Sequence, residues 1–407
     1  MKKTINWVGQ QLELRIEKVA HGGIFVARHD SRVIFVSHVL PGELVKARVF
    51  EDRGGSFARA EPIEIIEPSP DRVPQVWKDA GPGGAGGAEF GHIKLARQRE
   101  LKADVLEEAL QRMAGLELRP QVEALPGDDE RNGLGYRSRV QLHVAEDGTV
   151  GPYRERSHEV VKVKKLPLAV EDIQELEFQN RNFQDVQKIE VAASNTGGIH
   201  WKVDGKLKGD ERLVERAAGR TFRITGGGFW QVHRAAAEVL ASVVTEFAKS
   251  AGFDKSAHNL DLYGGVGLFA GALATGFGKD LKLTTVESFK QATEDAKLNL
   301  ADLNGVKAVC APVERFMAQH LSDKATEKFS AATVVIDPPR SGAGAKVVGQ
   351  LLELGPKHII YVACDPVALA RDLKPLMAGG YQLAAIRAFD LFPHTHHFET
   401  VASLVRE

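Results

Sequence analysis

A cysteine and a glutamate near the C-terminus have the chemistry of a nucleophile and a general base. Cys364 follows the apolar run 359–363 and precedes Asp365 and Pro366, a pattern that predicts a strand ending at a thiol and turning into a helix. Ligands bind at the carboxyl ends of strands in open α/β sheets, although an unpaired cysteine after an apolar run is also a common buried residue. Glu399 interrupts the apolar run 389–405. Burial there would raise its pKa and suit a base, and a buried structural ion pair would give the same pattern.

A second set of residues suits a nucleoside cofactor. The stretch 258–273 predicts a strand ending at Tyr263, a glycine loop that includes Gly264, Gly265 and Gly267, and a helix. Glycines let the backbone approach a ligand where free helix amides point. Glu287 ends the next predicted strand, about twenty residues beyond the loop, where an acid can bind ribose hydroxyls. Dehydrogenases and methyltransferases share such a loop, so it does not choose between them.

A rigid turn follows a third predicted strand. The segment Asp337-Pro338-Pro339-Arg340 holds the preceding backbone extended and fixes where Asp337 and Arg340 point. Three histidines, at 394, 396 and 397, invite a metal interpretation, but neither a second ligand cluster nor thiolates accompany them. We therefore expect no metal site.

The elements that carry these residues predict an α/β protein with three domains. Five short β segments with turn signals between them, in 12–66, predict a small, OB-like β-barrel over 1–67. A helix at 93–113 and strands at 136–144, 150–163 and 188–194 predict a mixed α/β middle domain over 68–225. Alternating apolar strands and amphipathic helices predict a doubly wound, Rossmann-like domain over 226–407.

Two groups of basic residues are candidates for RNA contacts, and in both a merely solvated surface is an equal explanation. In the barrel they are Arg28, Arg32, Lys46 and Arg48; in the middle domain they are Arg137, Arg139, Arg154, Arg156, Lys162, Lys164 and Lys165.

The bulk properties narrow the class of protein. The 407 residues carry a net charge of -1, which argues against a non-specific nucleic-acid coat but leaves room for a local basic face. Two cysteines cannot form a disulfide framework or ligate a cluster that needs four thiolates, so a cytoplasmic location is expected. No apolar run is long enough to span a membrane and the start is too polar for a signal peptide. A monomer without an obligate protein partner is the default.

In combination, these motifs resemble the family of S-adenosylmethionine-dependent RNA 5-methyluridine methyltransferases that carry a TRAM domain. The segments that resemble it are LDLYGGVGLF, the DPPR turn, YVACDP, FPHTHHFETV and GGGFWQVH, together with the TRAM-like barrel. The resemblance implies that Cys364 adds to uracil C6 and that Glu399 removes the C5 proton. Arg340 is a candidate to stabilise the charge that develops on the uracil oxygen, a hypothesis that rests only on its position two residues beyond Asp337-Pro338. The residues expected to hold S-adenosylmethionine are Gln231, Tyr263, Gly265, Glu287 and Asp337.

The sequence departs from this family in four places. The glycine loop has Gly264 or Gly265 where a cysteine is usual, and Asp365 and His233 stand where asparagine is common. The segment Ala85-Gly86-Gly87-Ala88 resembles the CGGC of members that carry an iron–sulfur cluster, with alanines in place of the cysteines. We therefore expect no iron–sulfur cluster.

Three other functions fit parts of the sequence. An exocyclic-amine nucleic-acid methyltransferase would use the same turn after its strand and needs no thiol. A non-catalytic RNA-binding protein would need only the barrel and the basic strands. A dehydrogenase would use the same glycine loop with a nicotinamide cofactor. The sequence leaves open whether the uridine lies in tRNA or in rRNA, and at which position.

Overall fold

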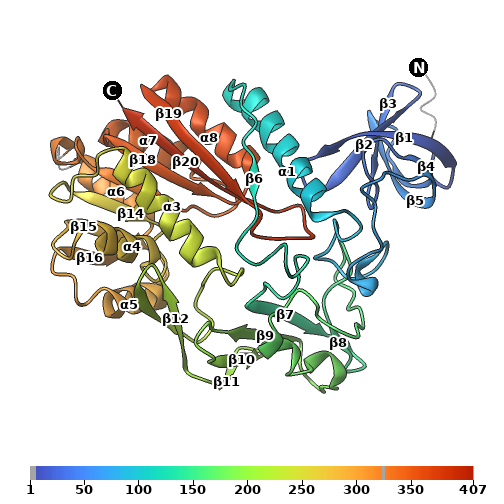
Figure 1. The fold of residues 1–407 in the computed structure, drawn as a ribbon, viewed down its shortest axis with the longest axis horizontal. Helices are drawn as coiled ribbons and strands as arrows, with labels where there is room; N and C mark the ends of the chain where they lie inside the picture. Colours follow the sequence, from blue (N-terminus) through green and yellow to red (C-terminus); the bar gives the residue numbers. More distant parts are fainter. Residues whose placement is uncertain (1–5, 323–325, 407) are drawn as a thin grey trace.

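The computed structural model describes residues 6–322 and 326–406, which form a closed barrel, a five-stranded sheet, a two-stranded sheet and an eight-stranded sheet. Figure 1 shows the barrel at one end of the molecule, the large sheet with its helices at the other, and the five-stranded sheet below them. The long helix α1 (Leu95–Ala109) lies between the barrel and the large sheet.

The N-terminal barrel has the strand order β1-β2-β3-β5-β4. Along β1, every second side chain from Leu12 to Ile16 is buried, because alternate residues of a strand face opposite sides and the inner ones fill the barrel. The predicted small barrel is therefore confirmed. Its strands are β1 (Gln11–Ala20), β2 (Ile24–His29), β3 (Arg32–Val36), β4 (Leu44–Asp52) and β5 (Phe57–Glu67).

The middle of the chain forms an antiparallel sheet of order β11-β10-β9-β7-β8. One difference from the sequence expectation lies at 150–163, where only Val150–Gly151 form a regular strand. Pro152 cannot donate a ladder hydrogen bond, and Arg156 has a φ of 57°, which extended strands do not adopt. The elements here are β7 (Arg139–Val144), β8 (Val150–Gly151), α2 (Glu171–Gln174), β9 (Lys188–Ala193), β10 (Ile199–Val203) and β11 (Lys206–Gly209).

The C-terminal half is built on the eight-stranded sheet of order β16-β15-β14-β17-β18-β20-β19-β6. The five strands from β16 to β18 are parallel, and β20 runs antiparallel to both β18 and β19. Its strands after β6 are β14 (Asn259–Leu262), β15 (Leu283–Glu287), β16 (Val306–Cys310), β17 (Thr333–Ile336), β18 (His358–Ala363), β19 (Tyr381–Phe389) and β20 (Glu399–Arg406).

Helices cover both faces of this sheet, as the predicted doubly wound fold requires. Residues of α6 (Val313–Ser322), α7 (Gly344–Leu354) and α8 (Pro366–Ala378) share one apolar core with alternate strand residues such as Ile359 and Tyr361. Residues of α3 (Ala236–Ser250), α4 (Leu268–Phe277) and α5 (Lys290–Asn299) share the opposite core with Ile360 and Val362. Because both faces of β18 are buried, its side chains are apolar without alternation.

Two segments from earlier in the chain complete this half. The strand β6 (Val122–Glu123) pairs in parallel with the end of β19, and α1 packs against α8. The hairpin β12 (Arg212–Ala217) and β13 (Arg220–Thr225) packs through β13 on α5. Parts of the predicted middle region therefore contribute to the core of the C-terminal half.

The run 389–405 is not one strand. The segment 390–398 leaves the sheet as a loop between β19 and β20, so Glu399 is the first residue of β20. No helix in the described ranges is both long and apolar enough to cross a lipid bilayer.

Candidate active site

Cys364 and Glu399 are brought together by strand pairing. The antiparallel register of β18 with β20 places Ala363 opposite Thr400, so the next residue of one strand lies beside the preceding residue of the other. Cys364 is partly exposed, whereas Glu399 is only 6% exposed. The thiol and the carboxyl group therefore meet at the edge of the sheet where the parallel strands end.

Asp337 joins them from the neighbouring strand. It directly follows β17, which pairs with β18, and its amide donates a hydrogen bond to the carbonyl of Leu262 in β14. Burial, and then the nearby Asp261 carboxylate, raise the pKa of Asp337 to about 7. Burial, and then Asp337, raise the pKa of Glu399 well above its ordinary value. Asp337 and Glu399 thus share a poorly solvated site, where ionisation of one carboxyl group disfavours ionisation of the other.

The same environment affects the thiol. Burial raises the pKa of Cys364 to about 12, and the carboxylates of Glu399 and Asp337 act in the same direction. The Arg340 guanidinium opposes both shifts by lowering the pKa of Cys364 and that of Glu399. Cys364 is therefore a thiol at neutral pH in the free protein, and a positive charge placed nearby would favour the thiolate.

The predicted cofactor residues line a small cavity beside Asp337. Its volume is about 40 Å³, and its walls include Gln231, Tyr263, Gly265 and Asp337, together with the 65% exposed ring of Phe229. Tyr263 has a φ of 62°, an uncommon conformation for a bulky residue that recurs at functional sites. Strand β14 thus ends in a strained turn that faces this cavity.

The glycine loop fits a ligand that approaches closely. A Cβ at position 264 would lie 1.9 Å from Thr285 Oγ1, so only glycine fits there, and Gly265 has a φ of 52° with open space on the side where a Cβ would project. Glu287 does not line the cavity, but its carboxylate accepts a hydrogen bond of 3.1 Å from the Gly265 amide. Three features together fit an adenosine-containing cofactor: the backbone amides of the loop, the exposed ring of Phe229, and the Glu287 carboxylate, which lies about twenty residues beyond the loop, where an acid can bind ribose hydroxyls.

A buried polar network that sequence reasoning missed holds the 390–398 loop. Gln98 of α1 donates to His394 Nδ1 and accepts from the His394 amide, and His394 Nε2 donates to the Asn132 carbonyl. Lys102, 1% exposed, forms a buried ion pair with Asp390. Gln98 and Lys102 are both fully buried polar side chains, and their burial can be recognised only from the packed structure. His394 is therefore structural, and it fixes the loop that leads into Glu399.

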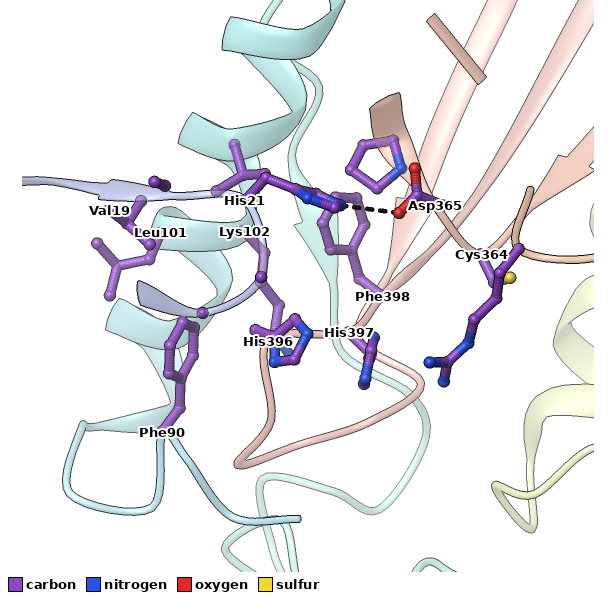
Figure 2. A pocket seen from close by; sticks show the side chains of 16 residues that line it. Val19, His21, Phe90, Leu101, Lys102, Cys364, Asp365, His396, His397 and Phe398 are labelled. Atoms are coloured by element: carbon purple, nitrogen blue, oxygen red, sulfur yellow. Dashed lines mark hydrogen bonds and ion pairs between the residues drawn. The ribbon is translucent and has the colours of Figure 1, made fainter. Parts of the chain in front are cut away.

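A second missed contact crosses from the barrel to the thiol. His21, in the turn after β1, lies 2.8 Å from Asp365, the residue that follows Cys364 and caps the N-terminus of α8. Figure 2 shows the imidazole reaching from the barrel toward Asp365 above the pocket that Cys364, His396 and His397 line. This pocket has a volume of about 220 Å³. The acid at position 365, where the resembled family commonly has asparagine, thus has a partner from another part of the fold.

Most of the predicted basic residues are engaged within the protein. Arg32 pairs with Asp52 at 2.6 Å, Arg28 with Glu17 at 3.4 Å and Arg48 with Glu61 at 3.5 Å. In the middle region Arg139 donates to the Gly228 carbonyl and Arg154 pairs with Glu159.

The remaining departures from the family pattern are packing features. Ala85 and Ala88 are buried in an apolar cluster with Trp77 and Tyr136, so methyl groups occupy the interior at the two positions where the resembled segment has cysteines. His233 Nε2 lies 3.1 Å from the Asp128 carboxylate, in a buried pair. No group of three or more metal-ligating side chains occurs in the part of the chain that the structure describes.

Comparison with known proteins identifies the family. Residues 210–407 match the profile of the tRNA (uracil-5-)-methyltransferases, and residues 7–63 match that of the TRAM domain. An uncharacterized RNA methyltransferase of Streptomyces avermitilis is 39% identical, over 98% of each chain. One from Bifidobacterium longum is 36% identical, over 97% of each chain. The crystal structure of the Pyrococcus abyssi tRNA (uracil-54, C5)-methyltransferase with S-adenosyl-L-homocysteine has the same fold, with a TM-score of 0.70, 22% identity and coverage of 96% of this chain and 99% of that one.

The barrel, the doubly wound sheet and full-length similarity to RNA methyltransferases agree. The chain belongs to the tRNA (uracil-5-)-methyltransferase family of RNA methyltransferases, whose methyl donor is S-adenosylmethionine.

Proposed function

We propose that this enzyme methylates C5 of a uridine in RNA through a covalent adduct between Cys364 and uracil C6. The observation that carries the proposal is the register of β18 with β20, which sets the thiol beside the Glu399 carboxyl group and next to the Asp337 strand end. A nucleophile and a base lie side by side, and the glycine loop at the end of β14 lies beyond the intervening strand β17, an arrangement that fits addition–elimination on a ring carbon.

The reaction needs the thiol because uracil C5 is a weak nucleophile. Cys364 releases its proton to solvent as it attacks, its sulfur forms a bond to C6, and the electrons of the C5–C6 double bond move into an enolate that makes C5 reactive. Bound S-adenosylmethionine would supply the methyl group from its sulfonium, with S-adenosylhomocysteine as the leaving group. After C5 is methylated, Glu399 takes the C5 proton, the S–C6 bond breaks, and Cys364 leaves as the thiolate.

The electrostatics of the site suit these steps. Because its pKa is raised, the Glu399 carboxylate is a stronger base than an exposed one, once it is ionised. The Arg340 guanidinium favours the charged forms of Glu399 and Cys364, and it lines the pocket beside Cys364 where the uracil oxygens would carry the enolate charge. The target base must leave its stack to reach the thiol.

Within this proposal, S-adenosylmethionine is held by the cavity that Gln231, Tyr263, Gly265 and Asp337 line. Glu287 approaches it through the Gly265 amide and is placed to accept hydrogen bonds from the ribose hydroxyls. A bound cofactor would compete with Gly265 for this carboxylate.

Trapping on 5-fluorouridine RNA tests the mechanism. Transcripts of cellular tRNA and rRNA containing 5-fluorouridine are incubated with the protein and S-adenosylmethionine, and adducts are sought on denaturing gels and by peptide mass spectrometry. Fluorine at C5 cannot leave as a proton, so the expected product is a stable adduct at Cys364 that is absent in Cys364→Ala. The exposed Cys310 provides the matched control, and Cys310→Ala should form the adduct as the wild type does.

The same experiment separates the alternatives. Methyl transfer to RNA that persists in Cys364→Ala would contradict the adduct mechanism and point to an exocyclic amine as the acceptor. Which transcript is trapped, tRNA or rRNA, identifies the substrate class.

A further inference from the structure

The outer face of the barrel beside the active-site pocket carries uncovered aromatic rings. On β3 and β5 alternate residues point outward, and among them are Phe35, Phe57 and Arg59. Phe57 is 41% exposed, and Phe50 on the adjacent β4 is 48% exposed. Single exposed apolar side chains are common, whereas several neighbouring rings form a patch of the kind that marks a binding surface.

These rings and Arg59 form an ordered cluster. The centroids of Phe35 and Phe57 lie 5.6 Å apart in an edge-to-face arrangement. The Arg59 guanidinium lies 5.6 Å from the Phe35 ring and 5.8 Å from the Phe57 ring, because the parallel register of β3 with β5 places Arg59 opposite Phe35. A planar cation held against two rings offers flat surfaces at fixed positions.

The cluster borders hollows that lead to the thiol. Phe35 and Arg59 line a hollow of about 440 Å³ between the barrel and α1, and Phe57 and Arg59 line another of about 770 Å³. His21 lines both of these and also the pocket that contains Cys364. The surface is therefore continuous from the rings, past His21, to the nucleophile. We call it the aromatic–arginine track, and its residues are His21, Phe35, Phe50, Arg53, Phe57 and Arg59.

The charge around the track favours an anion. Four arginines line the two outer hollows, at positions 53, 59, 112 and 156, against two carboxylates, Glu51 and Glu108. Glu51 lies 3.0 Å from Arg53 and 3.4 Å from Arg59, so one carboxylate faces two guanidinium groups, whereas Arg112 pairs with Glu108 at 2.8 Å and Arg156 with Glu155 at 3.5 Å. Arg53 and Arg59 thus share one acid, whereas the barrel arginines expected from sequence to meet RNA each pair with an acid of their own.

We propose that the aromatic–arginine track binds unpaired nucleotides that flank the target uridine. The bases stack on Phe35, Phe57 and the Arg59 plane while the phosphates meet Arg53. The proposal rests on the proposed function, since it takes the pocket at Cys364 to be where the uridine is bound. Stacking requires open base faces, so a loop or a single strand fits and a double helix, whose bases are already stacked, does not.

Fluorescence anisotropy with a labelled oligouridylate tests the track in the full-length protein. The same strand annealed to oligoadenylate serves as the double-helical probe. We expect Phe35→Ala/Phe57→Ala to raise the Kd for the single strand by about tenfold or more, since each stacked base is typically worth that much. Arg59→Ala should raise it about threefold or more and lower its salt dependence, because a cation that meets the strand is lost.

Matched control variants lie on the same barrel. Ile63→Ala removes another exposed apolar side chain of β5, 44% exposed and outside the three hollows, and Arg15→Ala removes an arginine of β1 paired with Glu67. Both should bind the single strand as the wild type does. Thermal unfolding checks the fold of every variant, and Phe57→Leu, which keeps the apolar volume but removes the ring, replaces any variant that does not fold.

The outcomes separate this proposal from the proposed function. Wild-type affinity of Phe35→Ala/Phe57→Ala for the single strand, or an equal loss for single strand and duplex, would overturn the track. If the track variants lose single-strand affinity but the wild type never forms an adduct at Cys364 with 5-fluorouridine RNA, the track stands and the covalent mechanism fails. If the adduct forms and the track variants bind normally, the mechanism stands and the track fails.

Discussion

Two buried glutamates, Glu43 in the barrel and Glu399 in the active site, are treated in opposite ways by the fold. Glu43 accepts hydrogen bonds from Arg72 Nε and Nη2 and from the amides of Leu40 and Ser69, so each oxygen has two donors. No side chain or amide in residues 6–322 and 326–406 donates a hydrogen bond to the Glu399 carboxyl group, which has instead Asp337 as a like-charged neighbour. A buried carboxylate whose oxygens all accept hydrogen bonds stabilises the fold. A buried carboxylate without such donors has a raised pKa and can act as a base.

Of the variants that test this comparison, Glu399→Gln is expected to have the largest effect, and the effect is on activity. The amide keeps the shape but cannot take the C5 proton, so we expect turnover to fall by about 10²- to 10⁴-fold. A methylated RNA adduct at Cys364 should accumulate, visible on a denaturing gel with ordinary RNA. The melting temperature should not fall, because the change removes a poorly solvated acid. Glu353→Gln, an exposed change on α7, is the control. A destabilised Glu399→Gln protein would show that Glu399 is structural after all.

For Glu43→Ala we expect the opposite result, a loss of stability. Removing this fully buried carboxylate leaves the partly buried Arg72 guanidinium and the amides of Leu40 and Ser69 without their acceptor, so we expect the free energy of unfolding to drop by about 3 kcal/mol or more. Urea denaturation followed by circular dichroism measures it. Glu61→Ala, which removes an exposed partner of Arg48, should cost less than about 1 kcal/mol. Equal losses in the two variants would remove the distinction between the two glutamates.

A pH series sharpens the comparison through Asp337. Its folded-state pKa of about 7 lies above the ordinary unfolded value of about 3.9, so the folded protein holds this proton more tightly. The corresponding stabilisation is complete below pH 4 and is lost as the pH rises through 7. Relative to the wild type, Asp337→Asn should therefore gain stability between pH 5 and pH 8. A stability difference that is constant over this range would contradict the raised pKa.

The smallest effect is expected where the two regions touch. The hydrogen bond with Asp365 raises the pKa of His21, so its stabilisation is present below about 6.5 and fades as the pH rises through the raised value. The His21 side chain is 50% exposed, and His21→Ala should cost less than about 1 kcal/mol at pH 6 and nothing at pH 9. Asp365→Asn should lose the same pH dependence while keeping the helix cap. If His21→Ala lost more stability at pH 9 than at pH 6, the raised pKa of His21 would be contradicted.

Much of the fold and the cluster at the strand ends were accessible from the sequence. Apolar runs that stop at Tyr263, Asp337 and Cys364 predict parallel strands, and parallel strands place their ends at one edge. Glu399 could be identified as a candidate base because it is an acid within an apolar run. Its position beside Cys364 could not be predicted, because that position depends on the register of β18 with β20. His21 and Gln98 lie far away in the chain, and nothing local marks a polar residue whose partner is in another element. The exposed rings of the track were hidden for the same reason, because strand alternation does not say what faces a distant pocket.

The placement of β6 has a consequence for how the chain can be divided. Val122 pairs with Ala388, so the large sheet acquires its last strand from a segment synthesised long before the rest of it. A protein truncated to start at residue 210, where the methyltransferase similarity begins, would leave the end of β19 as an open edge and uncover the face of α8 that α1 packs against. Open edges recruit strands from other copies. Such a fragment would aggregate, so the catalytic half could not be excised at residue 210.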